Sequence, residues 1–216
     1  MTTYGPHNRL FLSYEVAKDY LEEADILLFR SKSWTSFFIR QASRSTYSHV
    51  GLASWHNGCS NGLWELVEFR EFKGGRTTSL ERAVQKDSGK IDVYRPSYSR
   101  QHLVFNKNTM SVNEEWITID KKAITLLMRK LTGLPYGWKR IWWFAQWYIP
   151  GLRLIYDVNK IMDDTVGEVI YPVCSTAISY AFSYNDFDLL NNRSDEWVQP
   201  GDIALSSNLN YMFTLK

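Results

Sequence analysis

Two short apolar segments joined by turn residues constrain the fold class of this chain most strongly. Residues 49–55 and 63–72 are predicted strands, and residues 56–62 between them contain the pairs Asn57-Gly58 and Asn61-Gly62. Asn-Gly pairs are typical of turns because both residues tolerate a positive φ. We therefore expect an antiparallel hairpin with a longer loop. A hairpin of this kind favours an α+β fold over a parallel βαβ array.

Shorter patterns predict the remaining elements. Further strands are expected at 26–29, 91–95 and 203–206, a turn at 73–76, and irregular chain at 96–113. Helices are expected at 13–24, from Ser33 onward, at 80–84, at 121–131 after an Asp120 cap, and at about 172–184. No internal repeat or low-complexity linker divides the chain, so we predict one domain spanning residues 1–216.

Charge and hydropathy exclude several classes of protein. The chain has 25 Lys and Arg against 23 Asp and Glu, a net charge of +2. This balance does not show the excess of positive charge that is typical of proteins that bind nucleic acid. Residues 1–12 lack the apolar run of a signal peptide. No uninterrupted apolar run reaches the ~18–20 residues of a transmembrane helix. We therefore expect a cytoplasmic protein, with a phage-encoded protein or one delivered by another route as the alternative.

Cys174 is the first candidate for chemistry. The chain has only two cysteines, Cys59 and Cys174, too few for a disulfide framework. Pro172 and the apolar residues at 177, 178, 181 and 182 place Cys174 in the first turn of a helix. Unpaired N–H groups and the helix macrodipole at that turn favour a thiolate and can hold an oxyanion. From sequence position alone, the alternative is a buried cysteine that acts as a small apolar residue.

His49 is the natural base for such a thiol. It begins a predicted strand, and the small Gly51 on the same face leaves room beside it for the Cys174 helix. A thiolate–imidazole pair usually needs a third group that orients the ring. Glu65 and Glu68 on the next strand are three residues apart and point to opposite faces, so only one can face His49. The pattern alone leaves that choice open, and a structural histidine at a strand end is the alternative for His49.

Eight short motifs follow one another between residues 24 and 206. They are ADILLFR at 24–30, YSHVGL at 47–52, LVEF at 66–69, LERA at 80–83, IDVYRP at 91–96, GLPYG at 133–137, YPVCS at 171–175 and PGDIA at 200–204. In this order they resemble the permuted NlpC/P60 group of papain-like proteins, and more narrowly its YiiX/YebB-like branch. Three positions depart from that pattern: Ala24 replaces a glycine, Gly137 an acidic residue, and Thr176 a common glutamate.

The resemblance implies a fold and a set of site residues. The implied fold is a small antiparallel sheet or partial barrel, circularly permuted, with the cysteine helix packed on it. Cys174 is the implied nucleophile, His49 its base, and Glu68 rather than Glu65 the orienting residue. The resemblance also argues against a disulfide between Cys59 and Cys174. We assign oxyanion or substrate-binding roles to three tyrosines, Tyr47, Tyr136 and Tyr211.

These assignments predict a cysteine-dependent hydrolase of amide bonds. We expect a peptidase or amidase, on cell-wall-type peptides among others, that forms a thioester acyl-enzyme and uses no cofactor and no metal. One alternative is a lipid acyl hydrolase or acyltransferase resembling lecithin–retinol acyltransferase-like proteins. The other is a non-catalytic binding module on the same fold. The expected partner is accordingly a peptide, an amide or an acyl lipid.

Aromatic residues make up 15% of the chain, and many of them precede the cysteine helix. Four tryptophans lie in the segment 138–149, within an expected helical insertion at about 136–156. Twelve helical residues rise only about 18 Å, too little to span a bilayer. The segment is predicted to be either a core helix buried on all sides or an exposed lid or membrane-interface anchor that guides an apolar substrate to Cys174.

Overall fold

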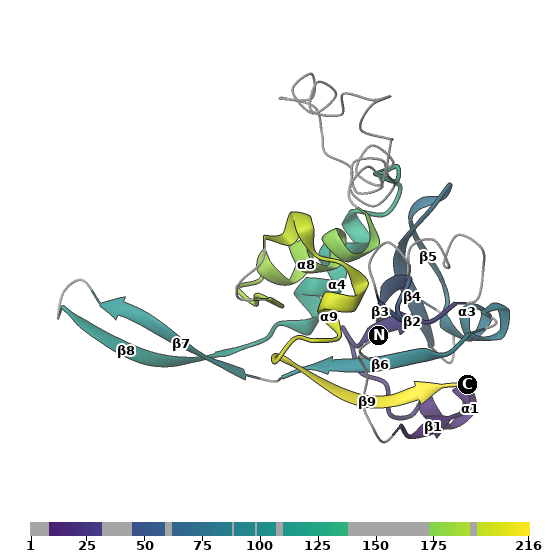
Figure 1. The fold of residues 1–216 in the computed structure, drawn as a ribbon, viewed down its shortest axis with the longest axis horizontal. Coiled ribbons are helices and arrows are strands. Elements are labelled where there is room, and N and C mark those ends of the chain that lie inside the picture. Colours follow the sequence, from purple (N-terminus) through teal and green to yellow (C-terminus); the bar gives the residue numbers. More distant parts are fainter. Residues whose placement is uncertain are drawn as a thin grey trace.

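A seven-stranded sheet forms the body of the molecule (Figure 1). The computed structural model describes residues 9–31, 45–58, 62–87, 89–97, 99–106, 110–137, 173–190 and 194–216. Across the sheet the strands lie in the order β1 (Phe11–Leu12), β9 (Leu209–Leu215), β6 (Ile91–Pro96), β2 (Ile26–Phe29), β3 (His49–His56), β4 (Leu63–Arg70) and β5 (Gly74–Ser79). All neighbours pair antiparallel except β1 and β9, which are parallel.

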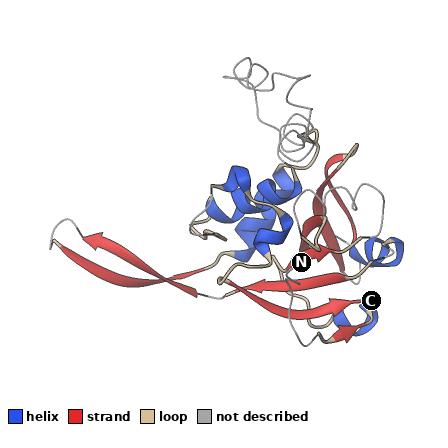
Figure 2. Cartoon of the chain, viewed as in Figure 1, coloured by secondary structure: helices blue, strands red, loops and turns tan. Residues whose placement is uncertain are grey.

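Helices cover this sheet. Those in the described part of the chain are α1 (Tyr14–Ala17), α3 (Leu80–Lys86), α4 (Lys121–Lys130), α8 (Cys174–Ser183) and α9 (Pro200–Ile203), with a 3₁₀ turn at Asp195–Trp197. Helices α4 and α8 pack on each other and on β3 and β4, and Figure 2 shows them grouped with α9 beside the sheet. The structure is therefore mixed α+β, as the sequence predicts.

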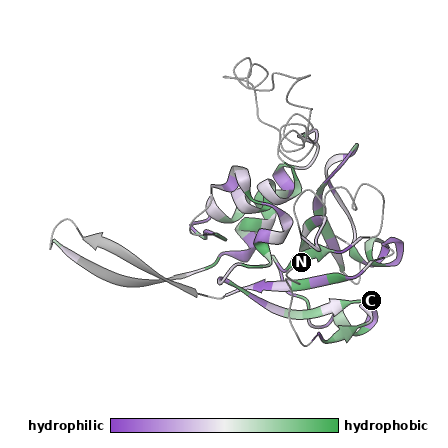
Figure 3. Cartoon of the chain, in the orientation of Figure 1, coloured by the Kyte–Doolittle hydropathy of each residue, from purple (hydrophilic) through white to green (hydrophobic). Residues whose placement is uncertain are grey.

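The central strand β2 has a core on both of its faces. All four of its residues are buried. Ile26 and Leu28 belong to the core cluster shared with α4 and α8, whereas Leu27 and Phe29 belong to a second cluster that includes residues of α3 and β9. Alternate residues of a strand point to opposite faces, so the sheet is covered on both sides. Figure 3 shows hydrophobic residues on strands and helices alike, as this layering requires.

Several predicted elements are confirmed. Strands β3 and β4 pair antiparallel, with Trp55 opposite Trp64, which is the expected hairpin. Helix α4 begins after Asp120, whose carboxylate accepts the Ala123 N–H at 2.9 Å. Such an N-cap satisfies a backbone donor at the helix start. Helix α8 begins at Cys174, in the expected position.

The predicted helix at 13–24 is wrong beyond its first turn. Helix α1 ends at Ala17, and a tight turn follows. Ala24 has a φ of 63°, in the left-handed region, and the Glu22 N–H donates to the Asp25 carboxylate at 2.8 Å. This local side-chain hydrogen bond stabilises a turn at the expense of a continued helix.

Predictions for three further segments were also wrong. Residues 96–113, expected to be irregular, include β7 (Ser99–Asn106) and the start of its partner β8 (Ser111–Thr118); these strands form a separate hairpin that extends from the body (Figure 1). A strand outside the main sheet is not required to bury one face, so it need not show the apolar alternation by which strands are predicted. The expected turn at 73–76 contains the start of β5. The expected strand at 203–206 does not form, because Pro200 starts helix α9, which ends at Ile203, and Asp202 accepts the Gln199 N–H at 2.9 Å; the next strand is β9.

Some expectations fall on residues outside the described ranges. They are the helix from Ser33, the aromatic segment at 138–149 and most of the insertion at 136–156. Within the described residues, no helix is both long and apolar enough to cross a membrane.

Candidate functional site

The Cys174 thiol lies at the start of helix α8. Cys174 is a free cysteine and is only 6% exposed. The N-cap residue is Val173, whose apolar side chain makes no capping hydrogen bond, so no capping side chain competes for the N–H groups of the first turn beside the thiol. The Thr176 hydroxyl accepts the Val173 N–H at 3.0 Å. Thr176 thereby makes the backward contact that glutamate makes at this position of a capping box, which explains how threonine is accommodated here.

His49 and Glu68 form a buried pair across the β3–β4 hairpin. Nε2 of His49 lies 2.6 Å from Oε2 of Glu68, and Glu68 is 1% exposed. The register places Glu68 directly opposite Gly51, and residues opposite one another share a face of the sheet. The glutamate therefore reaches diagonally to His49, two positions from Gly51, past a residue that has no side chain.

Arg76 on β5 completes the surroundings of this glutamate. It lies directly opposite Glu68 in the β4–β5 ladder, and its Nε and Nη2 donate to Oε1 of Glu68 at 2.8 and 2.5 Å. Arg70 is more distant, 3.9 Å from the same oxygen. Burial disfavours a charged Glu68, but the hydrogen bonds and charges of His49 and Arg76 outweigh it and lower the pKa of Glu68 to about 2.

His49 carries a charge that its neighbours stabilise. Burial opposes that charge, but interactions with the Cys174 thiol and with Glu68 raise the pKa of His49 to about 10. Because Nε2 is held by Glu68, the nitrogen left for Cys174 is Nδ1. That atom is buried and has no hydrogen-bond partner within the described residues, so it is available to the thiol. The three side chains therefore form a series in the order thiol, imidazole, carboxylate.

Tyr136 contacts the thiol from a loop that follows α4. Two backbone hydrogen bonds hold this loop against β5. The Gly75 N–H donates to the Leu134 carbonyl at 2.9 Å, and the Gly133 N–H donates to the Gly75 carbonyl at 2.8 Å. Burial raises the pKa of Tyr136 well above its usual value. The charge of Cys174 and the hydrogen bond between the two side chains raise this pKa further. The phenol therefore keeps its proton and donates it towards the sulfur.

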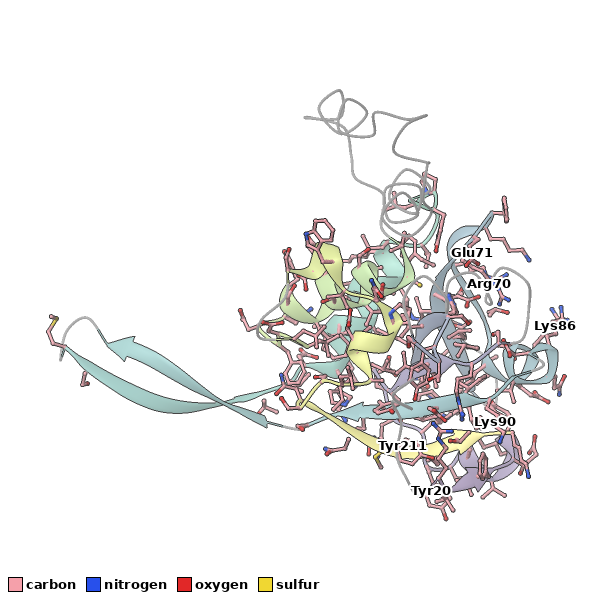
Figure 4. The ribbon with its side chains drawn as sticks, viewed as in Figure 1. Tyr20, Arg70, Glu71, Lys86, Lys90 and Tyr211 are labelled. Atoms are coloured by element: carbon pink, nitrogen blue, oxygen red, sulfur yellow. The ribbon has the colours of Figure 1, made fainter. Side chains whose placement is uncertain are left out.

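Two of the three predicted tyrosines belong to a different cluster. The Tyr47 hydroxyl donates to Asp92 at 2.7 Å, so its single proton is committed and the predicted oxyanion role does not fit this side chain. The Tyr211 hydroxyl lies 2.8 Å from Thr214, and its ring packs edge-on against Tyr94. Figure 4 shows Tyr211 on β9, well apart from Arg70 and Glu71 at the end of β4.

Glu65 is paired away from the site. Its carboxylate lies 2.6 Å from Nη1 of Arg129. The structure thus brings Cys174, His49, Glu68 and Tyr136 together, and the choice of Glu68 as the partner of His49 agrees with the geometry. Arg76 was missed by the sequence reasoning, because only the register of the undetected strand β5 places it beside Glu68.

Among the residues that the structure describes, no group of three or more His, Cys, Asp or Glu side chains could hold a metal ion. No family model matches the sequence, and no curated protein matches it either. Among solved structures, the metalloprotein YiiX (DUF1105) from Escherichia coli O157:H7 aligns with 88% of this chain and 96% of its own, at 16% identity and a TM-score of 0.46.

Proposed function

We propose that the protein is a cysteine-dependent hydrolase of amide bonds with the triad Cys174, His49 and Glu68, on a circularly permuted papain-like fold. One observation carries the proposal: the His49 ring has one nitrogen held by Glu68 at 2.6 Å and the other left for the Cys174 thiol. A nucleophile, a base and an orienting carboxylate in this series are the parts that covalent acyl transfer needs.

In the first half-reaction, the Cys174 thiolate attacks the carbonyl carbon and the π electrons move to the oxygen. The tetrahedral intermediate then expels the amine, which takes a proton from Nδ1 of His49, and a thioester remains on the sulfur. The raised pKa of His49, to about 10, supports this role because the ring holds its proton until the leaving group needs it.

In the second half-reaction, water attacks the thioester. The now neutral His49 removes a proton from the water, and the thiolate leaves as the carboxylic acid forms. Glu68 accepts the Nε2–H throughout and keeps the ring in one tautomer. The cycle ends with the same thiolate–imidazolium pair with which it began.

The developing oxyanion has two sources of stabilisation. The first is the start of helix α8, where no side chain caps the N–H groups. The second is the Tyr136 hydroxyl, which already interacts with the sulfur and takes the oxyanion role that we predicted for Tyr47.

An amide is the favoured substrate because an amine is a poor leaving group that needs a proton donor, which His49 supplies. An ester leaving group needs less help, so the same thiol also serves the alternative activity on acyl lipids. The experiment is a screen of peptide amides against phospholipid esters, using the wild type, Cys174→Ala and, as a matched control, Cys59→Ala. Turnover that is lost only in Cys174→Ala supports the proposal, and equal turnover by all three proteins contradicts it.

A further inference from the structure

Three neighbouring strands place His49, Glu68 and Arg76 on one face of the sheet. Glu68 stands directly opposite Arg76 on β5 and directly opposite Gly51 on β3, two positions from His49. The two oxygens of the carboxylate have different partners, since Oε2 receives His49 and Oε1 receives Nε and Nη2 of Arg76. The contact between Glu68 and His49 is therefore only one half of the environment of this carboxylate.

The Arg76 contact restricts Glu68 in two ways. The planar guanidinium offers two donors in a rigid fork, which fixes direction as well as charge. Glu68 is almost fully buried, so its carboxylate depends on protein groups for its hydrogen bonds. Without Arg76, Oε1 would be a buried acceptor with no close donor, because Arg70 at 3.9 Å is beyond hydrogen-bond distance.

We propose that Arg76 is a positioning residue for the reaction: it holds the Glu68 carboxylate ionised and in a fixed orientation, and Glu68 in turn holds His49 towards Cys174. This inference rests on the function proposed above. It assigns to Arg76 no contact with substrate, since Arg76 acts only through Glu68.

The charges around Glu68 give this role a pH signature. The groups that face it are His49 from β3, Arg76 from β5 and Arg70 from its own strand, with Cys174 and Tyr136 beyond the imidazole. A protonated Glu68 would present an O–H donor to Nε2 of His49 in place of an acceptor, and the ring tautomer would be lost. Removal of Arg76 raises the pKa of Glu68, so the thiol loses its activation at a higher pH than in the wild type.

The test follows alkylation of Cys174 by iodoacetamide over a pH series, with peptide mass spectrometry to separate Cys174 from Cys59. The variants are Arg76→Gln and Arg76→Lys. The matched control is Arg129→Gln, because Arg129 pairs with Glu65 and has a nearly equal side-chain exposure, 26% against 27% for Arg76.

In Arg76→Gln, the acid limb of the alkylation profile should lie at a pH about one unit higher than in the wild type. At a fixed pH on that limb, alkylation of Cys174 is then about tenfold slower. Arg76→Lys should restore the position of the limb, because the charge returns. It should still react more slowly than the wild type at every pH, because the fork does not return. Arg129→Gln should follow the wild-type profile.

Four results distinguish the two proposals. An acid limb unchanged in a folded Arg76→Gln, or moved equally in Arg129→Gln, overturns the inference about Arg76 while the proposed function stands. If Arg76→Gln does not fold, an Arg76→Lys protein with the wild-type rate at every pH overturns the inference. A wild-type Cys174 that reacts no faster than a free thiol at acid pH overturns the proposed function itself.

Discussion

Nε2 of His49 lies 2.6 Å from Oε2 of Glu68, and both side chains are more than nine-tenths buried. Burial makes each charge expensive unless the other is present. The pair is therefore sensitive to the loss of either partner, in stability as well as in reactivity. The following predictions separate these two effects.

Cys174→Ala and Cys174→Ser should each lower amide hydrolysis by about 10³-fold or more, because no other group supplies the nucleophile. Both variants should still fold, because His49 keeps its contact with Glu68, although one group that stabilises the charge of His49 is lost. Activity is measured on the best substrate from the screen, and the melting temperature is measured by circular dichroism. Wild-type turnover by Cys174→Ser would contradict the role of the thiol.

Glu68→Gln and Glu65→Gln form a matched pair on one strand. Glu68→Gln removes the charge that His49 and Arg76 share, and should lower activity by about 10²–10⁴-fold, because the ring loses its orienting acceptor. Glu65→Gln breaks only the ion pair with Arg129 and should leave activity near the wild-type value. Initial rates for both variants decide the assignment, and a larger loss at Glu65 would reverse it.

The pKa shifts predict how stability depends on pH. The pKa of His49 rises from 6.5 to about 10 on folding, so its contribution is complete below pH 6.5 and is lost as the pH rises through 10. The pKa of Glu68 falls from 4.5 to about 2, so its contribution is complete above pH 4.5 and is lost as the pH falls through 2. The free energy of unfolding, relative to that of His49→Asn, should be greatest between these limits. Urea denaturation over a pH series tests this, and a difference that stays constant from pH 6.5 to 10 would refute it.

Two tyrosines should respond to the loss of a hydroxyl in opposite ways. Tyr136→Phe removes a donor near the sulfur and should slow turnover by about 10–10³-fold with little change in stability. Tyr47→Phe removes a donor to the buried Asp92 and should cost about 1–3 kcal/mol of stability while turnover is retained. Rates and urea unfolding of both variants, measured together, test the distinction. Loss of turnover in a stable Tyr47→Phe would return the oxyanion role to Tyr47.

Gly51→Ala should disturb the His49–Glu68 contact without altering either residue. A Cβ at position 51 would lie 2.4 Å from Cδ1 of Leu66 and 3.3 Å from Cβ of Glu68. The crowding should destabilise the fold by about 1–3 kcal/mol and slow the alkylation of Cys174 at acid pH. A variant with wild-type stability and reactivity would show that the hairpin accommodates the extra methyl group.

The sequence predicted the elements that carry the chemistry better than it predicted the contacts between them. Apolar periodicity and turn residues were enough to find β3, β4 and helix α8, and so to place His49 and Cys174. The spacing of Glu65 and Glu68 could not select one of them, because that choice depends on which residue stands opposite Gly51. The register of two strands is set by their pairing in the folded sheet, and the spacing of residues along one strand does not determine it.

Other contacts were unpredictable for related reasons. Strand β5 begins with two glycines, which are typical of a turn. No strand was therefore predicted at Arg76, and its place beside Glu68 could not be foreseen. Tyr47 is close to His49 in sequence, yet its hydroxyl bonds to Asp92, 45 positions away. A motif places a residue along the chain, but the direction of its side chain depends on distant partners.

The order of strands in the sheet has a consequence for biosynthesis. Strand β9 lies between β1 and β6, although both of those strands leave the ribosome well before it. The position between them stays unfilled until Leu209–Leu215 has been translated. Pairing over such long sequence separations is slow, because the intervening chain must first be ordered. The sheet that supports the β3–β4 hairpin is therefore completed only after synthesis of this last strand, and a nascent chain interrupted before residue 209 would expose the unpaired edge of β6 to other chains.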